Sequence, residues 1–168
     1  MRFIVIFAVV VFSCGFYQAV AAQDSPANER FQAVGEDIVY DSQTGLMWAA
    51  RDNGRDIDWY DAEYYCKEFV AGGYTDWRLP SIDELSSLYT RERKNKDGYF
   101  ITDYITITDC CVWSADTNMG GASVFSYKSG RKPAGFLGDT YQLRALPVRE
   151  AEKKESDDNN KVMPRSAD

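Results

Sequence analysis

The most regular alternation of apolar and polar positions lies between residues 59 and 89, where two segments have the periodicity of amphipathic helices. From Trp59 to Phe69, apolar side chains recur three and four positions apart, which predicts a helix with one buried face. Asp58 stands before this segment as a potential N-cap. The pair Gly72 and Gly73 follows it, and glycine readily adopts the left-handed conformation that ends a helix.

A second helix is predicted to begin at Ser81, directly after Pro80. Glu84 lies three residues beyond Ser81, and this S-x-x-E spacing is typical of a capping box. Leu85 and Leu88 then provide the buried face of the helix. Two short amphipathic helices joined by an extended segment need a sheet to cover.

Short runs of β-branched and aromatic residues on both sides of the helical region predict the strands of this sheet. Before the helices, residues 31–34, 38–40 and 46–48 read as strands, with a turn at 41–45 in which Gly45 supplies a positive φ. After the helices, we expect alternating strand-like residues over 99–108, a central strand from 110 to 114, a loop at 116–121, a strand at 124–127 and a last strand at 141–148.

The two ends of the chain have a different composition from this central region. Arg2, the apolar run Phe3–Phe12 and an A-x-A pattern at 19–21 predict a secretory signal peptide over residues 1–21. An uncleaved membrane anchor and lipidation at Cys14 are the alternatives. We expect residues 22–30 to be a linker, 31–149 to be the folded domain and 150–168 to be a disordered polar tail. The mature chain is expected to be exported to the periplasm, the cell surface or the exterior. We expect it to have no stable membrane span.

Charge and composition exclude several classes of function. Acidic residues outnumber basic ones 26 to 19, giving a formal net charge of −7, so a nucleic acid is not an expected partner. The sequence contains no histidine, which removes Ser-His-Asp and Cys-His catalysis and histidine-based metal sites. We therefore predict no cofactor and favour a non-enzymatic protein. A carboxylate-based hydrolase or a thiol oxidase remains the enzymatic alternative.

Four strings carry a resemblance to a known family: TGLMW at 44–48, WYDAEYYC at 59–66, GGYTDWRLPSIDEL at 72–85 and VWSA at 112–115. The region from residue 31 to 149 resembles the bacterial domain-of-unknown-function family typified by the C-terminal domain of the Legionella collagen-like protein. The resemblance implies a compact α+β domain with a C-type-lectin-like fold, related to that of formylglycine-generating enzymes. Two short helices are expected to pack on a small, mostly antiparallel twisted sheet with long loops. It also implies an exported binding or adhesion module whose partner is a glycan or an envelope protein; an accessory subunit of an envelope complex is the alternative.

Three cysteines, Cys66, Cys110 and Cys111, remain after signal cleavage and enter an oxidising compartment. The resemblance implies a bridge from the helix cysteine to a cysteine in the last strand, but residues 144–149 contain none. We favour a bridge from Cys66 to Cys110 or Cys111, which closes a loop of about 45 residues and contributes on the order of 4 kcal/mol. A bond between the adjacent pair, and a Cu(I) site on its two thiolates, are the alternatives.

Candidate ligand-binding residues form two groups, and neither has the pattern of a metal site. Arg91, Arg93, Lys94 and Lys96 form a basic cluster that suits a sulfated or carboxylated glycan, or is a solvated loop. Trp113, Asp116 and Asn118 lie where lectin-like folds often bind ligands, although the triplets of calcium-dependent lectins are absent. Because tryptophans bury large areas, we expect at least three of the four to lie in the core.

Overall fold

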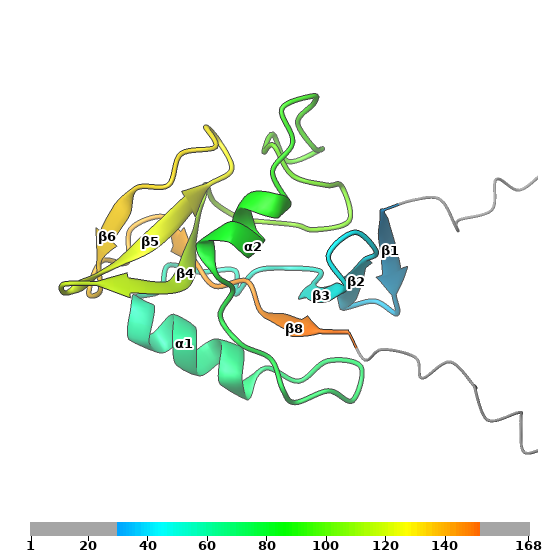
Figure 1. Cartoon of the computed structure of the whole chain (residues 1–168), viewed down its shortest axis with the longest axis horizontal. Helices are drawn as coiled ribbons and strands as arrows, with labels where there is room; N and C mark the ends of the chain where they lie inside the picture. Colours follow the sequence, from blue (N-terminus) through cyan, green and yellow to red (C-terminus); the bar gives the residue numbers. More distant parts are fainter. Residues whose placement is uncertain (1–29, 152–168) are drawn as a thin grey trace, which may run out of the picture.

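Residues 30–151 are described by the computed structural model, and they form two helices and two four-stranded sheets (Figure 1). The predicted signal peptide and nearly all of the predicted linker and tail therefore lie outside the described residues. Within 30–151, no helix is long and apolar enough to cross a membrane. In chain order the elements are β1 (Phe31–Val34), β2 (Ile38–Asp41), β3 (Leu46–Ala49), α1 (Trp59–Glu68), α2 (Ile82–Ser87), β4 (Cys111–Asn118), β5 (Gly121–Ser126), β6 (Ala134–Phe136), β7 (Leu143–Arg144) and β8 (Val148–Glu150).

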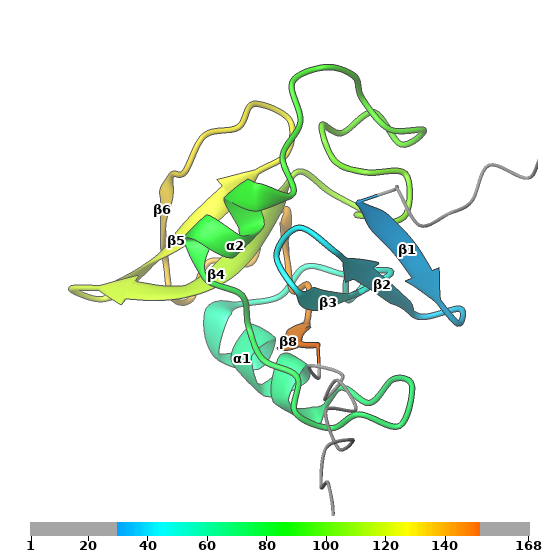
Figure 2. The ribbon, with the colours of Figure 1, turned by 45° about the vertical axis from the view of Figure 1, so that its right-hand side comes forward.

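The first sheet is antiparallel and has the order β1-β2-β3-β8. The predicted hairpin between β2 and β3 is confirmed, and its Gly45 has φ +71°. Because β8 comes from the end of the domain and pairs with β3, the two ends of the described chain lie in the same sheet. β1 forms the outer edge of this sheet (Figure 2).

The second sheet has the order β6-β5-β4-β7, in which only the pairing of β4 with β7 is parallel. β4 extends to Asn118, so the expectation of a loop at 116–121 was wrong; only Met119 and Gly120 turn the chain into β5. The predicted last strand is divided between the two sheets, β7 in the second and β8 in the first. Pro147 lies between them and lacks the N–H that a continuous strand would need.

The prediction of a strand over residues 99–108 was also wrong. This segment is a long irregular connection between α2 and β4. Its alternation of apolar and polar residues comes from isoleucines that are buried in the core, and not from a strand. Ile101, Ile105 and Ile107 turn their side chains into the main hydrophobic core without any neighbouring strand to pair with. A single parallel bridge between Arg51 and Thr106 is its only sheet-like pairing within the described chain.

Both helix starts agree with the predicted caps. The Asp61 N–H donates to the Asp58 carboxylate (2.8 Å) at the start of α1. At the start of α2, the Glu84 N–H donates to the Ser81 hydroxyl (3.2 Å) and the Ser81 N–H donates to the Glu84 carboxylate (2.7 Å), which completes the capping box. α1 packs on β4, and α2 packs on β4 and β5, so both helices cover the second sheet.

The core consists of a large cluster between the two sheets and α2, a smaller cluster beneath α1, and a third cluster of Ile38, Ala71 and Trp77. Trp48, Trp77 and Trp113 are buried, which confirms a core role for three of the four tryptophans. The domain is therefore α+β, with two short helices on mostly antiparallel strands as predicted, except that the strands form two sheets instead of one small one.

Candidate functional site

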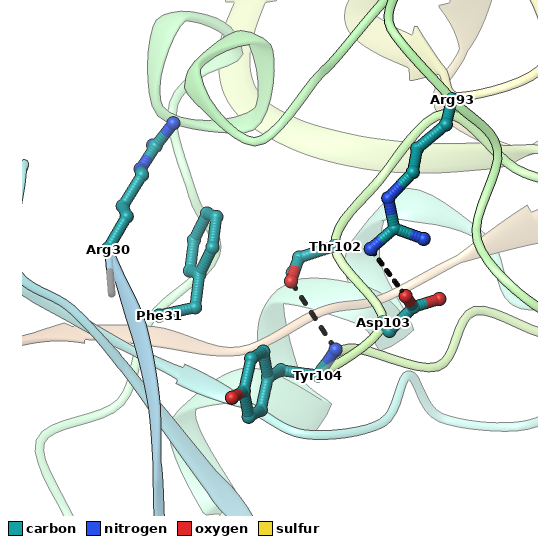
Figure 3. A pocket seen from close by; sticks show the side chains of 6 residues that line it. All are labelled: Arg30, Phe31, Arg93, Thr102, Asp103 and Tyr104. Carbon is teal, nitrogen blue, oxygen red and sulfur yellow. Dashed lines mark hydrogen bonds and ion pairs between the residues drawn. The ribbon is translucent and has the colours of Figure 1, made fainter. Parts of the chain in front are cut away.

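A hollow of about 450 Å³ opens between β1 and the long connection that leads from α2 to β4. Figure 3 shows its walls: two residues come from the start of β1, and the others from the connection. Its lining combines two guanidinium groups, two aromatic rings, two hydroxyls and one carboxylate, from Arg30, Phe31, Arg93, Thr102, Asp103 and Tyr104. Irregular backbone on one side and a sheet edge on the other therefore build the site.

Arg30 is fixed at one wall of the hollow by a buried carboxylate. Its guanidinium donates two hydrogen bonds to Asp41 (2.8 and 2.7 Å) and a third to the backbone carbonyl of Ser87 (2.9 Å), and it lies 4.5 Å from the centroid of the Phe31 ring. Burial raises the pKa of the Asp41 carboxyl, but hydrogen bonds from Arg30 and its other partners outweigh burial and leave that pKa below 3.8. The Arg30 guanidinium is therefore held in place by Asp41 and Ser87 and has a structural role in the wall of the hollow.

Arg93 occupies the opposite wall and is much more exposed. Its guanidinium lies 2.6 Å from the Asp103 carboxylate, and the two side chains are 70% and 42% exposed. Asp103 also accepts a hydrogen bond from the Lys96 N–H (3.1 Å). The hydrogen bond from Arg93 lowers the pKa of the Asp103 carboxyl, so this group stays ionised near neutral pH. This pair connects the basic cluster of the sequence to the hollow.

The remaining lining residues give the hollow its apolar surfaces. The Phe31 ring comes from β1 and the Tyr104 ring from the connection, and the Thr102 hydroxyl oxygen accepts a hydrogen bond from the Tyr104 N–H (3.4 Å) (Figure 3). Aromatic faces offer a broad contact area, while a hydroxyl and an exposed guanidinium offer hydrogen bonds. The arrangement suits a polar ligand that has one apolar face and one anionic group.

A second hollow of about 410 Å³ lies beside the start of α2, and its lining is acidic. Glu84 and Glu150, which line it, both accept hydrogen bonds from Arg78, at 2.7 to 2.9 Å. Asp83, on the same wall, pairs with Lys132 (2.9 Å). These carboxylates disfavour an anionic ligand, so this hollow differs in chemistry from the one beside β1.

The structure separates the residues that the sequence grouped as ligand contacts. Arg93 lines the hollow, whereas Arg91, Lys94 and Lys96 lie on the same exposed loop without lining it. The Lys94 ammonium lies 5.3 Å from the Phe100 ring centroid. The sequence contains no signal for the other lining residues, because the two walls of the hollow are some seventy positions apart in the chain. The five residues not predicted are Arg30, Phe31, Thr102, Asp103 and Tyr104.

In the second predicted group, Trp113 and Asp116 each have a structural contact, and the prediction that they bind a ligand stays a prediction. Trp113 is fully buried, and its indole N–H donates to the Ile57 carbonyl (2.9 Å), so it is a core residue. The Asp116 carboxylate accepts a hydrogen bond from the Ile82 N–H and so caps the first turn of α2. Asn118 is exposed at the end of β4, on a different part of the domain from the hollow.

The cysteines are paired differently from the bridge that we favoured. Cys110 and Cys111 form a disulfide with each other, with Cα atoms 3.7 Å apart, and Cys66 is a free, buried thiol. The expectation of a bridge from Cys66 was therefore wrong. Cys66 faces into the cluster beneath α1 with Ala62 and Ala145, while the adjacent pair closes on itself at the start of β4.

These features define a small α+β module with two sheets, two capped helices and an open, aromatic-lined hollow at one sheet edge. The family model described as the Lcl C-terminal domain matches residues 37–149. The chain belongs to the Lcl C-terminal domain family, as its sequence motifs predicted. A comparison with curated proteins found no match.

Proposed function

We propose that this chain is an exported, non-enzymatic binding or adhesion module and that the hollow beside β1 is its ligand site. Three features support export and binding: the leader-like composition of residues 1–21, the family to which the chain belongs, and the mixed aromatic and charged lining of the hollow. The lining of the hollow, two aromatic rings with an exposed arginine, is the observation that carries the proposal. The ligand class that fits best is an acidic glycan.

The proposed ligand contact is Arg93, because its present ion pair is easily exchanged. An ion pair between exposed side chains contributes only about 0–1 kcal/mol, so a carboxylate or sulfate can replace Asp103 at little cost. Residues 91–98 contain four basic and two acidic side chains, which makes this loop locally positive in an acidic protein. Such a loop attracts an anion within a Debye length of about 8 Å, while Phe31 and Tyr104 receive the apolar face of a sugar ring.

A glycan array, followed by titration of any acidic glycan that it identifies, tests this proposal. We expect Arg93→Ala and Tyr104→Ala each to weaken binding about tenfold, which corresponds to about 1.4 kcal/mol. Arg131→Ala is the matched control, because Arg131 is also exposed but lies outside the hollow. Higher salt should weaken the wild-type interaction and leave the Arg93 variant less affected. A blank array under varied pH and calcium would contradict the proposal.

A second candidate function, accessory subunit of an envelope complex, is favoured by a different surface. Tyr60, Met119, Phe136 and Tyr141 are exposed. Tyr60 lies in the first turn of α1, which is tied to the end of β6 by the hydrogen bond from the Trp59 N–H to the Leu137 carbonyl (3.0 Å). Co-purification of a partner from detergent-solubilised envelope, lost in Phe136→Ser, would support this function. A protein that remains monomeric and unassociated would contradict it.

A further inference from the structure

The disulfide between Cys110 and Cys111 lies where solvent reaches it and where sheet hydrogen bonds hold its backbone. Both residues are half-buried at the start of β4. The Cys110 carbonyl accepts a hydrogen bond from the Tyr127 N–H (2.8 Å), and Cys111 is paired with Ser126 on β5 and with Leu143 on β7. The backbone geometry of the pair therefore depends on the second sheet, and the shared peptide bond keeps the Cα atoms together whether or not the sulfurs are bonded.

Cys66 differs from this pair in its accessibility. Its side chain is fully buried beneath α1, and burial raises the pKa of its thiol far above the ordinary value. A buried thiol that stays protonated is inert, since the thiolate is the nucleophile and the metal ligand. Among the cysteines of residues 30–151, only the adjacent pair is thus open to reagents in the folded protein.

The charges beside the pair favour a cation over an anion. Asp109 accepts a hydrogen bond from the Cys110 N–H (2.6 Å), and its carboxylate lies 3.5 Å from the Lys128 ammonium and 3.8 Å from the Arg144 guanidinium. Arg144 is shared with two further carboxylates, those of Asp52 and Asp56. Three carboxylates thus face two cationic groups, and the surroundings carry a net negative charge.

We propose that Cys110 and Cys111 form a redox-gated binding site for one soft, thiophilic metal or metalloid cation. A dithiol reductant opens the site: two electrons and two protons pass from the reductant to the disulfide, which gives two thiols and leaves the reductant as its own disulfide. The two thiols then release their protons and bind the cation through both sulfurs, because soft thiolates select soft cations. Exchange with a disulfide oxidant closes the site again: two electrons and two protons pass from the two thiols to the oxidant, which becomes a dithiol, and the Cys110–Cys111 bond forms once more.

Phenylarsine oxide is a suitable probe, because two thiols condense with it to form a cyclic dithioarsenite and one molecule of water. The full chain is reduced with a phosphine, which becomes a phosphine oxide as water supplies the thiol protons. Excess phosphine is then removed without air.

Native mass spectrometry should show one arsenical per reduced chain and none on the oxidised chain, and peptide mapping should place it on Cys110 and Cys111. Loss of one thiol, in Cys110→Ser or Cys111→Ser, should weaken binding on the order of 100-fold or more, because the second bond is then no longer intramolecular.

Cys66→Ser is the matched control and should bind the probe as the wild type does. The comparison of oxidised with reduced wild-type protein needs no variant. It therefore tests whether binding of the arsenical requires reduction of the disulfide even if a serine variant fails to fold. Circular dichroism should be unchanged by reduction, because the sheet holds the backbone. Unfolding on reduction, equal uptake by the oxidised chain, or an arsenical located on Cys66 would each overturn the proposal.

Discussion

Cys66 on α1 and Ala145 between β7 and β8 are both fully buried in one hydrophobic cluster. The family resemblance implies a disulfide from the helix cysteine to a cysteine in the last strand, within an Arg-Cys-Val-Arg motif. In this chain, Arg144 is followed by Ala145, and the Ala145 N–H donates to the Asn53 side-chain oxygen (2.8 Å). The buried thiol of Cys66 thus shares a cluster with Ala145, which lies in the segment 144–149 where the resemblance implies a partner cysteine and this chain has none.

Ala145→Cys should therefore form a disulfide with Cys66 under oxidising conditions. The new bridge closes a loop of about 80 residues, for which the chain-entropy model gives on the order of 4 kcal/mol of added stability. Urea unfolding with and without reductant measures this gain, and alkylation counts the free thiols. The double variant Ala145→Cys with Cys66→Ser is the control and should lose the gain. Two free thiols at positions 66 and 145 in the oxidised protein would contradict the prediction.

Asp41→Asn should destabilise the domain by about 2 kcal/mol at pH 7, because it leaves the Arg30 guanidinium facing a neutral amide in a partly buried site. The pKa of the Asp41 carboxyl is lower in the folded protein than its ordinary value of 3.8. The stabilisation from the carboxylate is therefore complete well above pH 3.8, where the carboxyl is ionised in the folded and unfolded chain alike, and is lost as the pH falls through the folded pKa. Urea unfolding of both proteins at a series of pH values measures the difference.

The gap between wild type and Asp41→Asn should be widest at neutral pH and should close in acid. Asp37→Asn is a suitable control, because Asp37 is exposed on the turn between β1 and β2. That variant should change stability by less than about 0.5 kcal/mol at every pH. An Asp41→Asn penalty of the same size at pH 2 and pH 7 would show that the carboxylate charge is not its cause.

Elements set by local chemistry could be predicted from the sequence. Asp58, Ser81 and Glu84 cap the helices because their oxygens reach backbone N–H groups two or three residues away. Gly45 permits the hairpin turn for the same local reason. In each case, the residues that interact are neighbours in the chain, so their spacing alone indicates the structure.

Features set by distant contacts could not be predicted. The hollow joins Arg30 to Tyr104, and nothing local indicates that β1 lies beside the connection after α2. Ile101 and Ile105 gave a strand-like pattern although they only project into the core from an irregular segment. Asp116 resembled a ligand contact until the fold placed it at the start of α2. Each of these roles depends on contacts that the local sequence pattern does not indicate.

Asp116→Ala should lower stability by about 1 kcal/mol, because the Ile82 N–H at the first turn of α2 then loses its side-chain acceptor. The same variant should leave glycan binding unchanged, since Asp116 does not line the hollow beside β1. Asn118→Ala is the matched control, because Asn118 is also exposed on β4 and should change stability by less than about 0.5 kcal/mol. Urea unfolding and the glycan titration separate the two roles. Lost binding with unchanged stability would restore Asp116 as a ligand contact.

Gly135→Ala should destabilise the domain by about 1–3 kcal/mol, because the new methyl group would meet the ring of Trp113. A Cβ built on Gly135 lies 2.7 Å from Cη2 and 2.9 Å from Cζ3 of that ring. The ring cannot move aside, since it is fully buried and held by its hydrogen bond to the Ile57 carbonyl. Gly138→Ala is the control, because a Cβ on Gly138 meets nothing within 4 Å. Urea unfolding compares the two, and equal stabilities would show that β6 shifts freely away from Trp113.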